Sequence, residues 1–148
     1  MPLPVSESDF QNFIHEFESG TLAKSRWHHA EHVAVAFWYA SRLDEPTAVE
    51  KIRVGIQNLN SRHGVAQTPT GGYHDTWTIF FATLIHRFVA RDLDRSLPLI
   101  EKLNRTVRHF ADFREITRQY YSPERIDSWR HGVGNRGPLC WSKNVSSE

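Results

Sequence analysis

Three histidines in this chain of 148 residues have a type and spacing that suit metal binding. His29 and His32 are three positions apart in one apolar segment, and His74 stands at the start of another. Neutral imidazole is a good ligand for zinc, iron, nickel and copper, and residues three apart on a helix can both reach one ion. The sequence therefore predicts one divalent metal ion on His29, His32 and His74, zinc or iron first, with nickel, copper and manganese as further options.

The helical wheel supports this ligand set. With about 100° of rotation per residue, His29 and His32 fall on the apolar stripe of residues 27–43. On the wheel of residues 73–91, His74 falls on the most apolar side. A buried imidazole without a partner costs about 1–3 kcal/mol, and a shared cation removes that cost. The prediction therefore requires the two segments to meet inside the protein.

Three protein ligands leave positions open for water or substrate, which is the pattern of catalytic rather than structural metal sites. Asp75 follows His74 directly and is predicted to be a fourth ligand, a residue that orients a ligand, or a general base. Tyr73 and Thr78 are predicted to line the mouth of the site, and the loop 64–72 to cover it. Because a bound metal lowers the pKa of water to about 7, we expect a small enzyme of hydrolase or lyase type that activates water or a small oxygenated substrate.

Three alternatives use the same segments. If Asp75 is a ligand in place of one histidine, two histidines and a carboxylate suit an Fe(II)-dependent oxygenase. Residues 28–32 also match the H-x-x-E-H pattern of inverted zinc peptidases, with His28 and His32 as ligands and Glu31 as base. From a different class, the chain is a non-catalytic helical binding or oligomerisation module whose histidines hydrogen-bond one another or the backbone.

At these residues the chain resembles a widespread group of small, mostly uncharacterised bacterial proteins. The likeness rests on Trp27-His28-His29-Ala30-Glu31-His32-Val33, on Tyr73-His74-Asp75-Thr76-Trp77-Thr78 and, more weakly, on Tyr120-Tyr121-Ser122. It extends to about residue 125 and implies that His29, His32 and His74 belong to the site while His28 is variable. The expected bundle is also faintly similar to the DinB-like metalloproteins, although the His-x-x-x-His pair of their last helix is missing here.

The hydrophobic pattern predicts an all-α fold. Apolar residues recur at helical spacing, alternating strand patterns are nearly absent, and the connections are short. We expect a single-domain bundle of four to six helices over residues 1–130, followed by a Gly-rich extended tail over 131–148. The central helix should be 73–91, because it is apolar over most of its circumference. The helices are expected at about 7–20, 27–43, 46–63, 73–91, 98–110 and 112–121.

Composition excludes several classes of function. The 18 Lys and Arg against 17 Asp and Glu give a charge of +1 without a basic block, which argues against nucleic-acid binding. The apolar runs are too short to cross a membrane, and no secretory signal is visible. With Cys140 alone, no internal disulfide can form, so we expect a cytoplasmic protein acting on a small molecule. An exposed Trp38 opposite the buried stripe is compatible with a homodimer.

Overall fold

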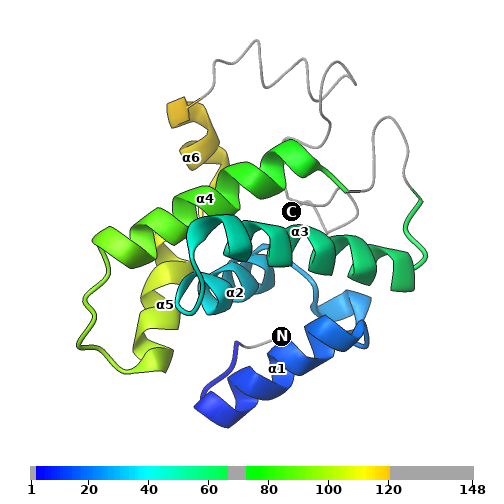
Figure 1. Ribbon diagram of the computed structural model, residues 1–148, viewed down its shortest axis with the longest axis horizontal. Coiled ribbons are helices and arrows are strands. Elements are labelled where there is room, and N and C mark those ends of the chain that lie inside the picture. Colours follow the sequence, from blue (N-terminus) through cyan, green and yellow to red (C-terminus); the bar gives the residue numbers. More distant parts are fainter. Residues whose placement is uncertain (1–2, 67–72, 121–148) are drawn as a thin grey trace.

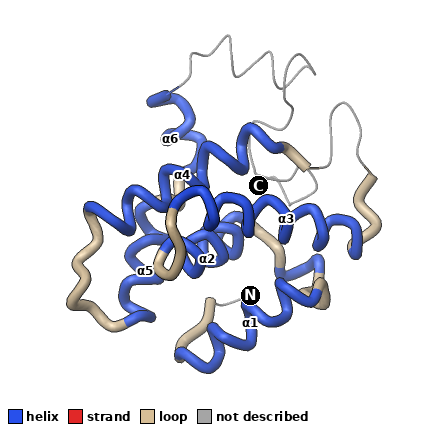
Figure 2. The backbone as a smooth tube through the Cα atoms, in the orientation of Figure 1, coloured by secondary structure: helices blue, strands red, loops and turns tan. Residues whose placement is uncertain are grey.

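The structure is a computed structural model that describes residues 3–66 and 73–120 (Figures 1 and 2). This part of the chain is all-helical and contains no extended strand, which confirms the predicted fold class. None of its helices is long and apolar enough to cross a membrane. The expected tail over 131–148 lies outside the described residues. The elements are α1 (Glu7–Ser19), the short 3-10 helix η1 (Lys24–Arg26), α2 (His29–Ala40), α3 (Glu45–Arg62), α4 (Asp75–Arg91), α5 (Leu99–His109) and α6 (Phe113–Tyr120).

Local capping sets several of these boundaries. The Ser6 hydroxyl accepts a hydrogen bond from the Asp9 amide at 3.1 Å and begins α1. The carboxylate of Asp112 accepts from the Glu115 amide at 3.0 Å and begins α6 in the same way. Gly20 ends α1 with φ of +77°, a left-handed conformation that glycine adopts without steric cost. The expected ranges 7–20 and 112–121 begin or end close to these residues, because capping signals are only a few residues long.

The helix that is buried over most of its length is α2, whereas the sequence analysis expected residues 73–91 in the central position. α2 contacts α3, α4 and α5 and lies among them in Figure 1. Residues 31–37 are all buried, including Glu31 and Ala34, which lie on the side of the helical wheel away from His29. Alanine and valine are short, so neighbouring helices can approach α2 from several sides. α4 instead exposes Ile79 and Arg87 on its outer face.

α1 is held against the bundle by a close approach to α3. A Cβ placed on Gly55 of α3 would lie 2.3 Å from the Phe17 ring of α1, so only glycine fits there. The Phe17 ring also packs on Trp27, with 5.4 Å between ring centroids. Trp27 in turn lies just before α2, so this packing fixes the segment that enters the candidate site.

Trp38 is less open than the sequence indicated. It is half-buried, its ring meets Phe10 of α1 edge-on at 4.9 Å, and the Arg42 guanidinium lies 3.3 Å from its ring centroid. An arginine stacked on an indole covers apolar surface. The homodimer therefore stays a prediction with a weaker basis than an exposed tryptophan would give.

Candidate functional site

The first turn of α2 positions the two neighbouring histidines. The helix begins at His29, two residues later than expected, with His28 as its N-cap. The Glu31 carboxylate accepts a hydrogen bond from the His28 amide at 3.1 Å, which satisfies one of the N–H groups that a helix start leaves without a partner. His29 therefore lies in the first turn, and His32 lies one turn further along the same side.

His29 is held by a hydrogen bond to a distant part of the chain. Its Nε2–H donates to the Phe110 carbonyl at 2.7 Å, and its ring packs against Phe113 at 4.6 Å between ring centroids. Burial lowers the pKa of His29 to about 4, although this hydrogen bond opposes the shift. The ring is therefore neutral at pH 7, and Nδ1 carries the lone pair. That nitrogen is buried and has no hydrogen-bond partner in the described part of the chain.

His32 is fully buried one turn later. Its Nδ1–H donates to the His28 carbonyl at 2.6 Å, and its ring stacks on Trp27 with centroids 3.9 Å apart. Burial lowers the pKa of His32 to about 3; the hydrogen bond opposes this shift, and the neighbouring His29 and His28 add to it. His32 is therefore also neutral, with its lone pair on Nε2. His32 therefore lies in the core, whereas the side chain of His29 is only partly buried.

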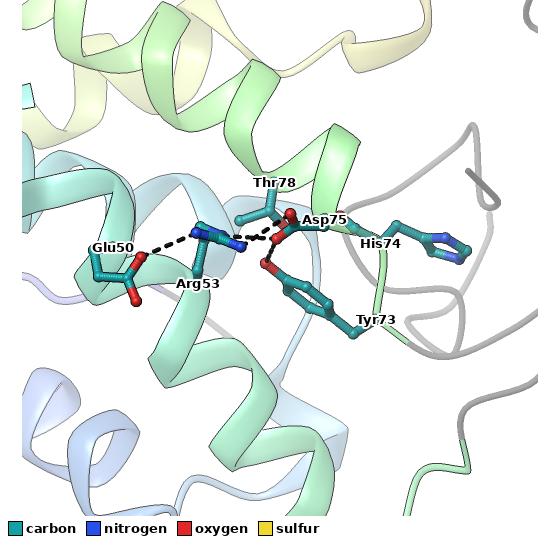
Figure 3. Close-up of polar contacts among 6 residues, drawn as sticks. All are labelled: Glu50, Arg53, Tyr73, His74, Asp75 and Thr78. Atoms are coloured by element: carbon teal, nitrogen blue, oxygen red, sulfur yellow. Dashed lines mark hydrogen bonds and ion pairs between the residues drawn. The ribbon is translucent and has the colours of Figure 1, made fainter. Parts of the chain in front are cut away.

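His74 lies at the N-cap of α4 and is only 1% exposed. α4 packs against α2, as the prediction required. Figure 3 shows the His74 ring pointing away from the carboxylate of Asp75. Among residues 3–66 and 73–120, no three His, Cys, Asp or Glu side chains are grouped so that they hold a metal ion. The set His29, His32 and His74 therefore stays a prediction.

Asp75 forms an ion pair with Arg53, a residue that the sequence did not predict to belong to the site. The Arg53 guanidinium of α3 donates from Nε to Oδ1 at 2.7 Å and from Nη2 to Oδ2 at 3.0 Å (Figure 3). The Tyr73 hydroxyl donates to the same Oδ1 at 2.8 Å. Partial burial raises the pKa of Asp75, but the hydrogen bonds from Arg53 and Tyr73 and the charge of Arg53 outweigh it, so the pKa lies below its ordinary value. Nothing in the sequence links positions 53 and 75, because they meet only through the packing of α3 on α4.

These contacts restrict what the three predicted catalytic residues can do. A carboxylate with a lowered pKa is a weak base, so the contacts of Asp75 suit the positioning of Tyr73 better than proton abstraction. Burial, together with the hydrogen bond to Asp75, raises the pKa of the Tyr73 hydroxyl, which therefore stays protonated. Thr78 is fully buried, and its hydroxyl donates to the His74 carbonyl at 3.0 Å, so it supports the first turn of α4.

Tyr73 also borders a cavity, as expected of a residue at the mouth of a site. The cavity has a volume of about 330 Å³, and its other walls come from Gln57, Asn60, Ser61 and Val65. Most of these side chains are polar, so the cavity suits a small polar molecule. Residues 67–72 of the predicted covering loop lie outside the described part of the chain.

The H-x-x-E-H alternative finds little support in these positions. The His28 side chain is 43% exposed at the N-cap, and its Nδ1 lies 3.8 Å from the Glu31 carboxylate. Glu31 is buried and caps the helix. His28 and Glu31 therefore serve the helix start in this structure.

Comparison with known proteins supplies no relative. Searches against protein-family models, curated proteins and solved structures gave no match to this chain. The chemistry of the site residues is therefore the basis for a functional proposal.

Proposed function

We propose that this protein binds one divalent metal ion, zinc or iron, through His29, His32 and His74, and acts as a small metal-dependent enzyme on a small oxygenated molecule. The observation that carries the proposal is the buried Nδ1 of His29, a neutral ring nitrogen with no hydrogen-bond partner in the described part of the chain. A buried acceptor left in this state costs about 1–3 kcal/mol. A cation at this nitrogen would remove the cost.

The hydrogen bonds of the two α2 histidines also suit metal ligation. In each ring one N–H donates to a backbone carbonyl, that of Phe110 for His29 and that of His28 for His32. Such a bond fixes the tautomer and orientation of a metal-binding histidine and makes its other nitrogen a stronger ligand. Because both rings are neutral at pH 7, neither has to lose a proton before it binds metal.

The proposal includes a rearrangement of the histidine rings, because the described side chains do not form a group of three ligands. When bound, the metal would lower the pKa of a water molecule to about 7. The chain itself contributes the Tyr73 hydroxyl beside the polar cavity, and the Arg53–Asp75 pair holds that hydroxyl in place. Because the O–H of Tyr73 donates to Asp75, we propose that the Tyr73 oxygen orients the substrate by accepting a hydrogen bond from it.

Metal binding can be tested with a matched pair of variants. His29→Gln keeps a donor for the Phe110 carbonyl and removes Nδ1. His63→Gln is the control, because His63 likewise donates from Nε2 to a carbonyl, that of Leu22, at 2.7 Å and has a buried Nδ1 without a hydrogen-bond partner among the described residues. Each protein, purified without added metal, is submitted to elemental analysis and then titrated with zinc by calorimetry.

We expect about one equivalent of metal per chain in the wild type and in His63→Gln. In His29→Gln the affinity should fall at least about tenfold. Bound iron with oxygen-dependent turnover would favour the Fe(II) oxygenase alternative. That alternative needs Asp75 as a metal ligand, whereas both carboxylate oxygens of Asp75 accept hydrogen bonds from Arg53 and Tyr73 in this structure. The proposal is wrong if the wild type neither contains nor binds metal, or if both variants bind it equally.

A second candidate function rests on the same hydrogen bonds. His29, His63 and His86 each join two distant segments by donating to a backbone carbonyl. Histidines used in this way are typical of a non-catalytic binding or oligomerisation module. This candidate predicts that a chelator leaves the free energy of unfolding unchanged, whereas the metalloenzyme predicts that the chelator lowers it.

A further inference from the structure

A second cavity, which none of the predicted metal ligands lines, lies between the N-terminal segment, α1 and the start of α2. Its volume is about 320 Å³, which is within the range of small-molecule sites. Leu3, Val5 and Phe13 form apolar walls. The charged groups that line it are Asp9, Glu16, Glu31 and Arg26.

Glu31 is the unusual member of this lining. Its side chain is only 6% exposed, and one oxygen, Oε1, accepts the hydrogen bond from the His28 amide. Within residues 3–66 and 73–120, Oε2 receives no hydrogen bond and no Lys or Arg forms an ion pair with the carboxylate. A carboxylate that is this little exposed is costly without a close cation, and the nearest imidazole nitrogen, Nδ1 of His28, lies 3.8 Å from Oε1, so the cavity contains a group that a cation would stabilise.

The other charged side chains of the cavity leave it with an excess of negative charge. Arg26 forms an ion pair with Glu16, with 2.9 Å between Nη1 and Oε1. Asp9 adds a further carboxylate, so three carboxylates face one guanidinium. The described His, Cys, Asp and Glu side chains form no metal-holding group, and apart from Asn12 the remaining walls are apolar. The lining therefore matches an organic cation better than a metal ion.

We infer that this cavity binds a small organic cation, a primary amine or guanidinium compound with a short hydrocarbon chain. The cationic group pairs with Glu31, and the hydrocarbon chain lies against Leu3, Val5 and Phe13. The apolar contact supplies affinity by removing hydrocarbon from water, and the carboxylate supplies selectivity for positive charge. No lining residue of this cavity is one of the predicted metal ligands.

The inference is tested by amide NMR of the full chain in the presence of EDTA, which keeps it separate from metal binding. The probe is n-butylammonium chloride, and n-butanol and sodium butyrate are the neutral and anionic controls. We expect saturable shifts at Phe13 and Glu31 with n-butylammonium, and at least about tenfold weaker binding of both controls. Absence of saturable shifts with n-butylammonium, or equal binding of n-butanol, overturns the inference.

Two variants locate the binding. Glu31→Gln keeps the side-chain volume and an oxygen for the His28 amide but removes the charge, so n-butylammonium should bind at least about tenfold more weakly. Glu101→Gln, at an exposed ion pair on α5, should bind as the wild type does. If circular dichroism shows that Glu31→Gln does not fold, Val5→Lys is used in its place. Val5 is 78% exposed, so this replacement should not disturb the fold, and the ammonium that it places at the cavity should weaken the binding of n-butylammonium. Unchanged affinity in the folded variant overturns the inference.

Discussion

The Nε2 of His29 lies 2.7 Å from the carbonyl oxygen of Phe110, a residue 81 positions further along the chain. This hydrogen bond joins the first turn of α2 to the C-cap of α5. A helix leaves its last carbonyls without partners, and a side-chain donor is one way to satisfy them. The bond therefore stabilises the packing of two helices and also determines which nitrogen of His29 carries the lone pair.

Removing this bond should destabilise the protein. His29→Ala leaves the Phe110 carbonyl without its donor, so we expect the free energy of unfolding to fall by about 1–3 kcal/mol. His29→Gln keeps a donor at nearly the same position and should recover most of the loss. Urea denaturation measures both variants, and His15→Ala, at an exposed position of α1, is the control. Equal losses in the Ala and Gln variants would contradict the role given to this hydrogen bond.

Stability should decrease in acid because of the same residue. The pKa of His29 is about 4 in the folded chain against 6.5 as its ordinary value. Between these values the unfolded chain binds a proton that the folded chain does not, so stability is complete above about pH 6.5 and is lost as the pH falls to about 4. For His29 alone the loss is on the order of 3 kcal/mol.

His32, with a pKa of about 3, extends this loss to lower pH. Urea denaturation at a series of pH values checks the slope. His29→Gln should have a shallower slope than the wild type, whereas His15→Gln should not. A wild-type stability that is independent of pH over this range would show that these histidines are not held neutral.

The Arg53–Asp75 pair should control the titration of Asp75 more than the stability of the fold. In Arg53→Ala the two hydrogen bonds and the positive charge are lost while the partial burial remains, so the pKa of Asp75 should rise. Because both side chains are about one third exposed, we expect a stability loss below about 1 kcal/mol. Carboxyl NMR measures the pKa, and Arg105→Ala, which breaks the exposed pair with Glu101, should leave it unchanged.

Gly55 should not tolerate even a methyl group. A Cβ at this position lies 2.3 Å from the Phe17 ring, so Gly55→Ala forces α1 and α3 apart. Overpacking of this kind costs about 1–3 kcal/mol, which calorimetric melting can detect. Val54→Ala is the neighbouring control, because Val54 is 55% exposed and should change stability by less than about 0.5 kcal/mol. A Gly55→Ala variant as stable as the wild type would show that the two helices separate without cost.

The sequence by itself determined the helices, several of their ends, and the buried positions of His32 and His74. Helical periodicity and capping are local, since a side chain acts on backbone only a few residues away. For this reason the Ser6 and Asp112 caps and the glycine that ends α1 were predictable without knowledge of the fold.

Only the tertiary structure decided which residues meet across helices. The contacts of His29 with Phe110 and of Arg53 with Asp75, and the burial of Glu31, depend on how the helices pack, and no short-range pattern encodes that packing. The helical wheel of α2 places Glu31 on the side away from the buried stripe, because a wheel of this kind assumes one buried face. Short side chains instead let other segments cover α2 on nearly every side, so a larger share of α2 than of α4 is buried.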